Sequence, residues 1–207
     1  MGLTLADLYL IKKHAVGLPD GKATFLGVPD INFSKEAAEL VLGTELNFAA
    51  LPPHRRESTG MLAQKSLNFS DLSKILGIEN SETLDINNYE DSSRTFDLNI
   101  DSFCEDEIET SSIVIDAGVL EHVFDVPNAL NEVGKKLKKG GVVIHLNPGN
   151  GFYEHGFWQI SPTLYRNFYQ SAGWEIECMG FYKLPPRVGR LVDLQYLKTN
   201  SDLYRKR

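Results

Sequence analysis

The sequence lacks several features that would indicate particular classes of protein. Only two cysteines, Cys104 and Cys178, occur in 207 residues, so there is no framework of disulfides and no cysteine spacing that binds a metal. We expect both to be buried or half-buried thiols. No hydrophobic run is long enough to cross a bilayer, and the start shows no basic segment followed by an apolar one. We therefore expect a cytoplasmic protein without a membrane span or signal peptide.

The sequence is also poor in positive charge. It has 21 lysines and arginines against 28 aspartates and glutamates, a formal net charge of −7. Nucleic-acid backbones are bound by clustered positive charge, so no nucleic-acid partner is expected. The acidic run at residues 101–109 is interpreted as a solvated face and not as a metal site. Since 42% of the residues are hydrophobic, one domain spanning residues 1–207 is expected.

Residues 111–148 form the clearest structural pattern in the chain. A β-branched apolar run at 113–115 leads to Asp116 and Gly118, as in a buried strand that carries a polar group at its carboxyl end. A helix follows, with Asp125 as N-cap, a lysine-rich last turn and Gly140 as left-handed C-cap. A second buried run at 142–146 completes a βαβ unit, in which His145 is expected to be a hydrogen-bonded core residue.

The first part of the chain predicts a helix, a strand and a second helix. Thr4 and Asp7 resemble a capping box that opens a helix over residues 4–16. A strand at 23–28 runs into a loop containing Asp30. Ser34 then caps a helix that ends at Gly43.

The middle of the chain predicts a long connection and two further strands. Residues 44–69 show no periodicity, and we interpret them as an insertion or a lid over the functional site. Strands are expected at 82–86, which contains Asp85, and at 94–100.

The last part of the chain predicts one helix and two strands. Ser161 and Pro162 begin a helix that ends at Gly173, with strands at 174–182 and 192–197, the latter antiparallel. Four helix residues are expected to pack inward: Leu164, Tyr165, Phe168 and Ala172. The pattern as a whole predicts a doubly wound α/β fold with a mostly parallel, Rossmann-like sheet of seven strands.

At this point the residues resemble a known family. The acidic residue Asp116, the segment Val-Leu-Glu-His-Val at 119–123, the turn Leu-Lys-Lys-Gly-Gly at 137–141 and the Asn-Pro at 147–148 are similar to the second half of class I methyltransferases. The resemblance extends from Leu84 to Trp174. It implies transfer of a methyl group from S-adenosylmethionine to a hydroxyl or amine of a small molecule.

The resemblance also implies which residues bind the cofactor. Gly27 and Asp30 belong to the loop after the first strand, which approaches the methionine and ribose. Asp85, or else Glu90, accepts hydrogen bonds from the ribose hydroxyls, because a carboxylate offers paired acceptors to a vicinal diol. Asp97 and Leu98 would recognise the adenine end, with Asn99 as an alternative. The methionine end would be bordered by three residues: Asp116, Gly118 and Glu121.

The candidate catalytic base is His155, in an aromatic loop that follows the fifth strand, with support from Tyr153 and Glu154. Methyl transfer to a hydroxyl needs a base to accept the proton, and the ordinary pKa of histidine lies near neutrality. The alternative is that His155 only braces the loop.

Two other functions are compatible with the pattern. The loop after the first strand keeps a single glycine, Gly27, and Pro29 removes one N–H donor. A methyltransferase-like protein that has lost catalysis and acts as a binding or scaffolding module is therefore an alternative. A dinucleotide reductase is disfavoured, because pyrophosphate binding needs a three-glycine loop at this place.

Overall fold

The fold is seen in a computed structural model of the chain, which describes residues 2–15, 18, 21–31, 33–46, 48–50, 65–67, 71–73, 76–78, 80–104 and 109–181. The chain divides into two compact units, Met1–Asn147 and Pro148–Arg207. The first unit contains the main sheet. The second begins with a loop that leads into a helix.

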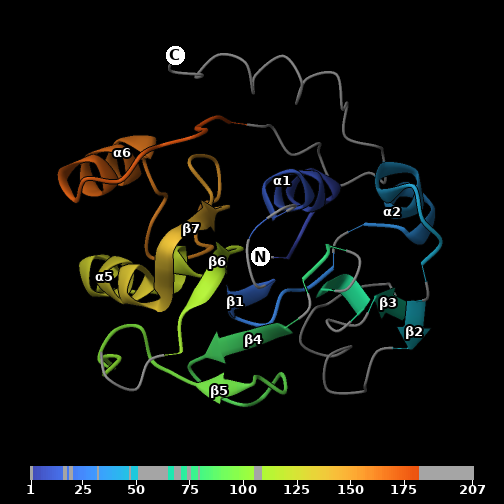
Figure 1. The fold of residues 1–207 in the computed structure, drawn as a ribbon, viewed down its shortest axis with the longest axis horizontal. Helices are drawn as coiled ribbons and strands as arrows, with labels where there is room; N and C mark the ends of the chain where they lie inside the picture. The colour runs from blue at the N-terminus through green and yellow to red at the C-terminus, as the bar shows by residue number, and fades with distance from the viewer. Residues whose placement is uncertain are drawn as a thin grey trace. The chain divides into compact units, whose positions relative to one another are not determined.

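A five-stranded, all-parallel sheet forms the centre of the first unit (Figure 1). Its strands are β1 (Lys22–Leu26), β4 (Asn80–Asp85), β5 (Arg94–Thr95), β6 (Ser111–Asp116) and β7 (Leu137–His145). Their order is β5-β4-β1-β6-β7, so the chain builds outward from β1 first on one side and then on the other. This order is typical of a Rossmann-like sheet, and the predicted α/β class is confirmed. The prediction of seven strands with an antiparallel last strand is not: the described part of this sheet has five, all parallel.

Helices flank the sheet on both sides. Alternate residues of the two central strands join one hydrophobic core with α1 (Leu5–Ala15) and α2 (Lys35–Leu42), as the two-residue period of a strand requires. These strand residues are Ala23, Phe25, Ile113 and Ile115. Helix α5 (Val126–Lys136) lies on the opposite side of the sheet from α1 (Figure 1).

Local signals set the predicted helix ends. Thr4 N donates to the Asp7 carboxylate at 2.8 Å, and Asp7 N donates back to Thr4 Oγ1 at 3.3 Å, which is the predicted capping box. Ser34 caps α2, and Gly43 ends it in the left-handed conformation with a φ of 69°. Asp125 caps α5 by accepting from Asn128 N at 3.0 Å.

The junction between α5 and β7 differs from the prediction. The helix ends at Lys136, and the following lysines belong to β7 and not to a last helical turn. Leu137 already pairs with Ser111, and the register then shifts before Ile113. Gly140 is left-handed, as expected, but it belongs to this irregular strand. A Cβ on Gly141 would lie 2.8 Å from the Ser112 carbonyl oxygen, so the second glycine is needed for close strand approach.

One predicted strand of the first unit is shorter in the structure, and the long connection at 44–69 contains short strands. The strand expected at 94–100 covers only Arg94–Thr95, because Asp97 N turns to the Asp101 carboxylate at 2.7 Å. The segment at 44–69 contains two short strands, β2 (Phe48–Ala50) and β3 (Lys65–Leu67), which pair with each other antiparallel. The rest of this segment from residue 51 to 64 lies outside the described residues.

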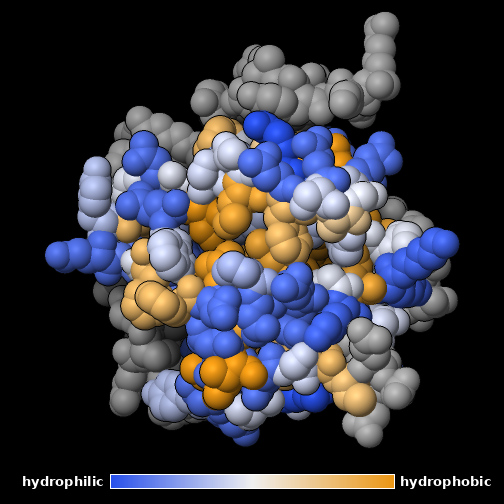
Figure 2. Space-filling view, turned by 90° about the vertical axis from the view of Figure 1, so that its left-hand side faces the viewer, coloured by the Kyte–Doolittle hydropathy of each residue, from blue (hydrophilic) through white to orange (hydrophobic). Residues whose placement is uncertain are grey.

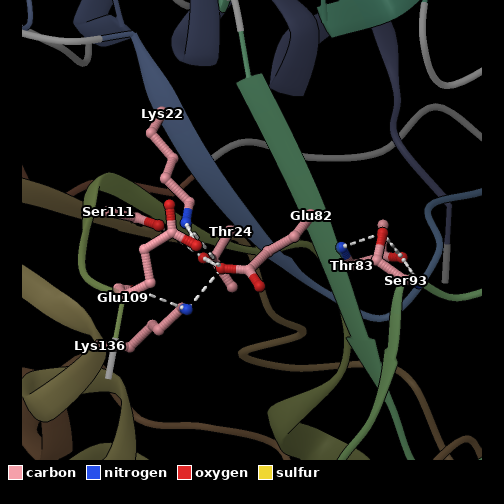
Figure 3. Close-up of polar contacts among 8 residues, drawn as sticks. All are labelled: Lys22, Thr24, Glu82, Thr83, Ser93, Glu109, Ser111 and Lys136. Atoms are coloured by element: carbon pink, nitrogen blue, oxygen red, sulfur yellow. Dashed lines mark hydrogen bonds and ion pairs between the residues drawn. The ribbon is translucent and has the colours of Figure 1, made fainter. Parts of the chain in front are cut away.

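Charged side chains are paired beside the amino-terminal halves of the central strands (Figure 3). Lys136 is only 2% exposed, and its Nζ contacts the Glu82 carboxylate and the Glu109 carbonyl oxygen, the latter at 2.6 Å. Glu82 also accepts a hydrogen bond from Thr24 Oγ1 at 2.8 Å, and Lys22 pairs with the Glu109 carboxylate at 2.7 Å. A buried ammonium is costly unless it is paired in this way. The network therefore attaches the end of α5 to β1, to β4 and to the segment that precedes β6.

The second unit is described as far as residue 181. Helix α6 (Pro162–Ser171) begins at its predicted cap, Ser161. Its buried residue is Tyr169, which contacts Trp174, whereas Leu164 is 38% exposed and Ala172 is exposed. The predicted inward packing of those two residues is therefore wrong.

No strand is present at 174–181, contrary to the prediction, and the strand expected at 192–197 lies outside the described residues.

Cys104 and Cys178 are both exposed, which corrects the expectation of buried thiols. None of the helices in the described ranges is long and apolar enough to cross a membrane. On the face drawn in Figure 2, hydrophobic residues gather in patches among hydrophilic ones.

Candidate functional site

The candidate site lies at the carboxyl ends of β1, β4 and β6. The chain leaves β1 toward β4 on one side, while β6 pairs with β1 on the other. In open α/β sheets, ligands bind where the strand order reverses in this way. The strand register places Gly27, Asp85 and Asp116 at this edge of the sheet, since Leu26 pairs with Leu84 on one side and with Asp116 on the other.

Gly27 makes the sharp turn that leaves β1. Its φ is +71°, a value that residues with a side chain rarely adopt, and its N–H donates to the Leu84 carbonyl oxygen at 2.6 Å. A Cβ on this residue would lie 2.9 Å from Val119 Cγ2 and 3.8 Å from Asp85 Oδ2. The backbone of Gly27 is thus directly flanked by the ends of both neighbouring strands.

Asp85 is the acidic residue that lies nearest to this turn. It ends β4 and is half-buried, and its Oδ1 accepts a long hydrogen bond of 3.4 Å from Asn87 N. Oδ2 is the atom directed toward Gly27. Glu90, the alternative ribose ligand, lies in the turn between β4 and β5. The geometry at Gly27 therefore favours Asp85 over Glu90 as the candidate ribose ligand.

Asp30 belongs to a loop that is attached to the start of the chain. Leu3 N donates to the Asp30 carbonyl oxygen at 2.7 Å, and Leu3 forms a parallel bridge with Ile31. Leu3 is fully buried. This attachment, together with the fixed φ of Pro29, restrains the loop that follows Gly27.

Asp116 is fully buried, and its carboxylate holds the turn that follows β6. Oδ1 accepts from Val119 N at 3.0 Å and from Leu120 N at 3.3 Å. Oδ2 lies 2.9 Å from His145 Nδ1, so His145 is the hydrogen-bonded core residue that was predicted. Gly118 allows the turn, with a φ of +84°. Asp116 thus positions Val119, which packs against Gly27.

Glu121 is a second buried carboxyl group in this region. It lies in the short helix η1 (Leu120–His122), has no exposed surface and accepts a hydrogen bond from Asn147 Nδ2 at 2.9 Å. Burial raises the pKa of Glu121, and the nearby Asp116 carboxylate raises it further, against the opposing effect of the Asn147 hydrogen bond. His122 is 42% exposed, with Nε2 4.0 Å from Glu121 Oε1.

The turn after β5 is built around Asn99. Asp97 Oδ1 accepts from the backbone and side-chain nitrogens of Asn99, and Asn99 Oδ1 accepts from Phe124 N and Asp125 N. Leu98 is buried, and its carbonyl oxygen accepts from Asn128 Nδ2 at 2.8 Å. These contacts attach the turn to the start of α5. They give Asn99 a structural role, and recognition of adenine by Asp97 and Leu98 stays a prediction.

His155, the candidate base, belongs to the second unit. Its ring contacts that of Phe152 edge to face at 5.7 Å, and burial lowers the pKa of its imidazole. A lowered pKa favours the neutral imidazole, which is the form that can accept a proton. Tyr153 is 83% exposed, and Glu154 is exposed with a φ of +60°.

The structure brings Gly27, Asp85 and the turn at Gly118 to one place, while their binding of a cofactor stays a prediction. Sequence reasoning missed two residues there. Val119 packs against Gly27, and Asn147 donates a hydrogen bond to Glu121. The Asn-Pro pair was used only as part of the family resemblance, and a polar residue at the carboxyl end of a parallel strand was the available signal.

Comparisons with protein-family models, curated proteins and solved structures gave no match. The α/β class therefore rests on the strand order and pairing described above.

Proposed function

We propose that this protein transfers a methyl group from S-adenosylmethionine to a hydroxyl or amine of a small molecule. The observation that carries the proposal is the juxtaposition of Gly27 and Asp85 at the point where the strand order reverses. A left-handed glycine lets a ligand approach the backbone closely, and a carboxylate 3.8 Å from the position of its absent Cβ offers paired acceptors to a ribose diol.

The residues of the first unit fit the cofactor in different ways. Asp85 would bind the ribose, with Gly27 and Asp30 in the adjoining loop, and Asp97 and Leu98 would lie at the adenine. Three residues would border the methionine end: Asp116, Gly118 and Glu121. Because both carboxylate oxygens of Asp116 already have partners inside the protein, Asp116 would act by holding the turn and not by direct contact.

The chemistry requires little from the protein beyond positioning. When bound, S-adenosylmethionine supplies an electrophilic methyl group on a sulfonium. The acceptor oxygen or nitrogen forms a bond to the methyl carbon as the sulfur–carbon bond breaks, and the acceptor proton passes to a base. His155, whose lowered pKa favours the neutral imidazole, is proposed as that base.

A methyltransferase-like binding protein without catalysis is the second candidate. Val119 Cγ2 lies against the open side of Gly27, at 2.9 Å from the Cβ position, and the following loop is attached to Leu3. These contacts favour a closed turn over one that receives a ligand.

Isothermal titration of the protein with S-adenosylmethionine and S-adenosylhomocysteine separates the two candidates. We expect micromolar binding of both, and about tenfold or greater weakening by Asp85→Asn, because a charge-assisted pair of hydrogen bonds to the ribose is lost. Asp91→Asn is the matched control: Asp91 is exposed in the connection after β4, and asparagine tolerates its φ of +57°. Absence of binding at millimolar ligand would overturn the methyltransferase proposal and leave the binding module.

A further inference from the structure

A second surface with ligand-binding character lies in the loop of residues 148–160, here called the aromatic loop. Its two ends are joined by a hydrogen bond of 2.8 Å from Ile160 N to the Pro148 carbonyl oxygen. Within it, Phe152 N donates to Gln159 Oε1 at 3.3 Å, and His155 N donates to the Phe152 carbonyl oxygen at 3.4 Å. A loop with joined ends and internal contacts of this kind is an Ω-loop, a structure that is frequently functional.

The aromatic loop exposes three large aromatic side chains. Tyr153 is 83% exposed, Phe157 65% and Trp158 43%. Exposed aromatic rings are costly in water, and their gathering in one short segment marks an interaction site. Glu154, next to Tyr153, has a left-handed φ of +60°. A residue with a side chain is held in that conformation at a cost, which is a feature of ligand-binding segments.

The charge around these rings indicates what they bind. The aromatic loop contains Glu154 and no lysine or arginine. With histidine neutral, the formal charge of residues 148–160 is therefore −1. A positively charged ligand would be attracted both by the Glu154 carboxylate and by the negative faces of the aromatic rings.

We propose that the aromatic loop binds a small organic cation of the alkylammonium type. Aromatic faces combined with a carboxylate are the group set that recognises such cations. Cation binding does not require the cofactor. The additional statement that this cation is the methyl acceptor, an amine, rests on the proposed function.

The test uses choline as the probe and its uncharged carbon isostere, 3,3-dimethylbutan-1-ol, as the comparison, in saturation-transfer NMR titrations of the full chain without S-adenosylmethionine. The two probes have the same shape and differ in charge. We expect choline to bind with a roughly millimolar Kd and the isostere to bind at least about fivefold more weakly, since the cation–π attraction is absent from it.

Two substitutions identify the site. Tyr153→Ala should weaken choline binding about two- to thirtyfold, and Glu154→Gln should weaken it and flatten its salt dependence. Tyr89→Ala, which removes a 55% exposed tyrosine from the first unit, is the matched control and should leave choline binding unchanged. Thermal denaturation of each variant checks that the fold is kept.

Equal binding of choline and the isostere would overturn the proposal and indicate an apolar ligand. Loss of choline binding in Tyr89→Ala, with none in Tyr153→Ala, would overturn the location. No saturable binding of choline would overturn the proposal without affecting the methyltransferase assignment, because S-adenosylmethionine binding is measured separately. If choline binds and S-adenosylmethionine does not, the cation site stands and the amine is not a methyl acceptor.

Discussion

Gly27 is the residue on which the candidate cofactor site most directly depends, and its substitution separates two costs. Gly27→Ala and Gly43→Ala both place an alanine at a φ near +70°, which costs about 1–2 kcal/mol. At Gly43 nothing lies within 4 Å of the new Cβ, whereas at Gly27 Val119 Cγ2 lies 2.9 Å away. We expect Gly27→Ala to lose ~1–3 kcal/mol more in the free energy of unfolding, measured by urea denaturation.

The double variant Gly27→Ala with Val119→Ala is the control for this prediction. It removes the atom with which the new Cβ collides. Adding Gly27→Ala to the Val119→Ala variant should therefore cost less free energy of unfolding than adding it to the natural chain. Equal losses for Gly27→Ala and Gly43→Ala would show that Val119 does not close over the turn.

Glu121 gives a prediction about pH. Its folded-state pKa is raised by burial, so its ionisation is less favourable in the folded protein than in the unfolded chain. Stability is therefore lost as pH rises above the ordinary carboxyl pKa of 4.5 through the raised folded-state pKa. Glu121→Gln removes this ionisation and keeps an oxygen that can accept from Asn147. The free energy of unfolding of the variant minus that of the natural chain should therefore be larger at neutral pH than at about pH 4.

Urea denaturation of both chains at several pH values checks this prediction. Contributions from other titrating groups cancel in the difference between the two chains wherever the substitution leaves those groups undisturbed. A difference that stays constant with pH, or one that moves in favour of the natural chain as pH rises, would contradict it.

At the residue scale, the sequence predicted positions better than contacts. It placed Asp85 and Asp116 at strand ends, because an apolar run that stops on an acidic residue is a local signal for the end of a buried strand. It did not show that the Asp116 carboxylate turns inward to His145 and the Val119 and Leu120 amides. The direction of a side chain depends on partners distant in sequence, and a single sequence does not reveal them.

Among the elements, α5 is attached to the sheet through one buried lysine. Lys136→Met keeps the apolar stem but removes the ammonium group, which lies 5.4 Å from the centroid of the Phe103 ring, and leaves the Glu82 carboxylate without its closest cation. We expect a loss of roughly 3 kcal/mol in the free energy of unfolding, toward the low end for a broken buried pair because Lys22 remains 3.8 Å away. Urea denaturation measures the loss.

Adding Glu82→Gln to Lys136→Met tests the cause. If the loss comes from an uncompensated carboxylate, the double variant should recover part of it, giving a coupling of ~1–3 kcal/mol. Additive losses would indicate that packing of the lysine stem, and not its charge, attaches α5.

The same contacts explain where element boundaries could not be predicted. Four lysines before Gly140 favour a longer helix by local propensity, but Lys136 is bound to Glu82 and Leu137 pairs with Ser111, so the helix ends earlier. Likewise, the hydrogen bond from Asp97 N to Asp101 ends β5 where the sequence suggested that a strand continues. By contrast, the caps at Thr4, Ser34 and Asp125 were predicted because their signals are local.

At the scale of the whole molecule, the two proposed sites lie in different units. All strands of the parallel sheet and every residue proposed to bind the cofactor precede residue 148, and the aromatic loop begins there. A division of this kind is common in proteins that bind one ligand on a sheet edge and recognise another through a loop. It makes the two binding activities separable in principle.

A fragment of residues 1–147 provides the corresponding test. It keeps the five-stranded sheet with α1, α2 and α5, so we expect α/β circular dichroism and a cooperative unfolding transition. It should bind S-adenosylmethionine within about tenfold of the full chain, a difference of ~1.4 kcal/mol, because Gly27 and Asp85 remain. It should no longer bind choline. A folded fragment that binds choline as the full chain does would place cation recognition outside the aromatic loop, whereas a folded fragment without affinity for S-adenosylmethionine would show that residues after 147 complete the cofactor site.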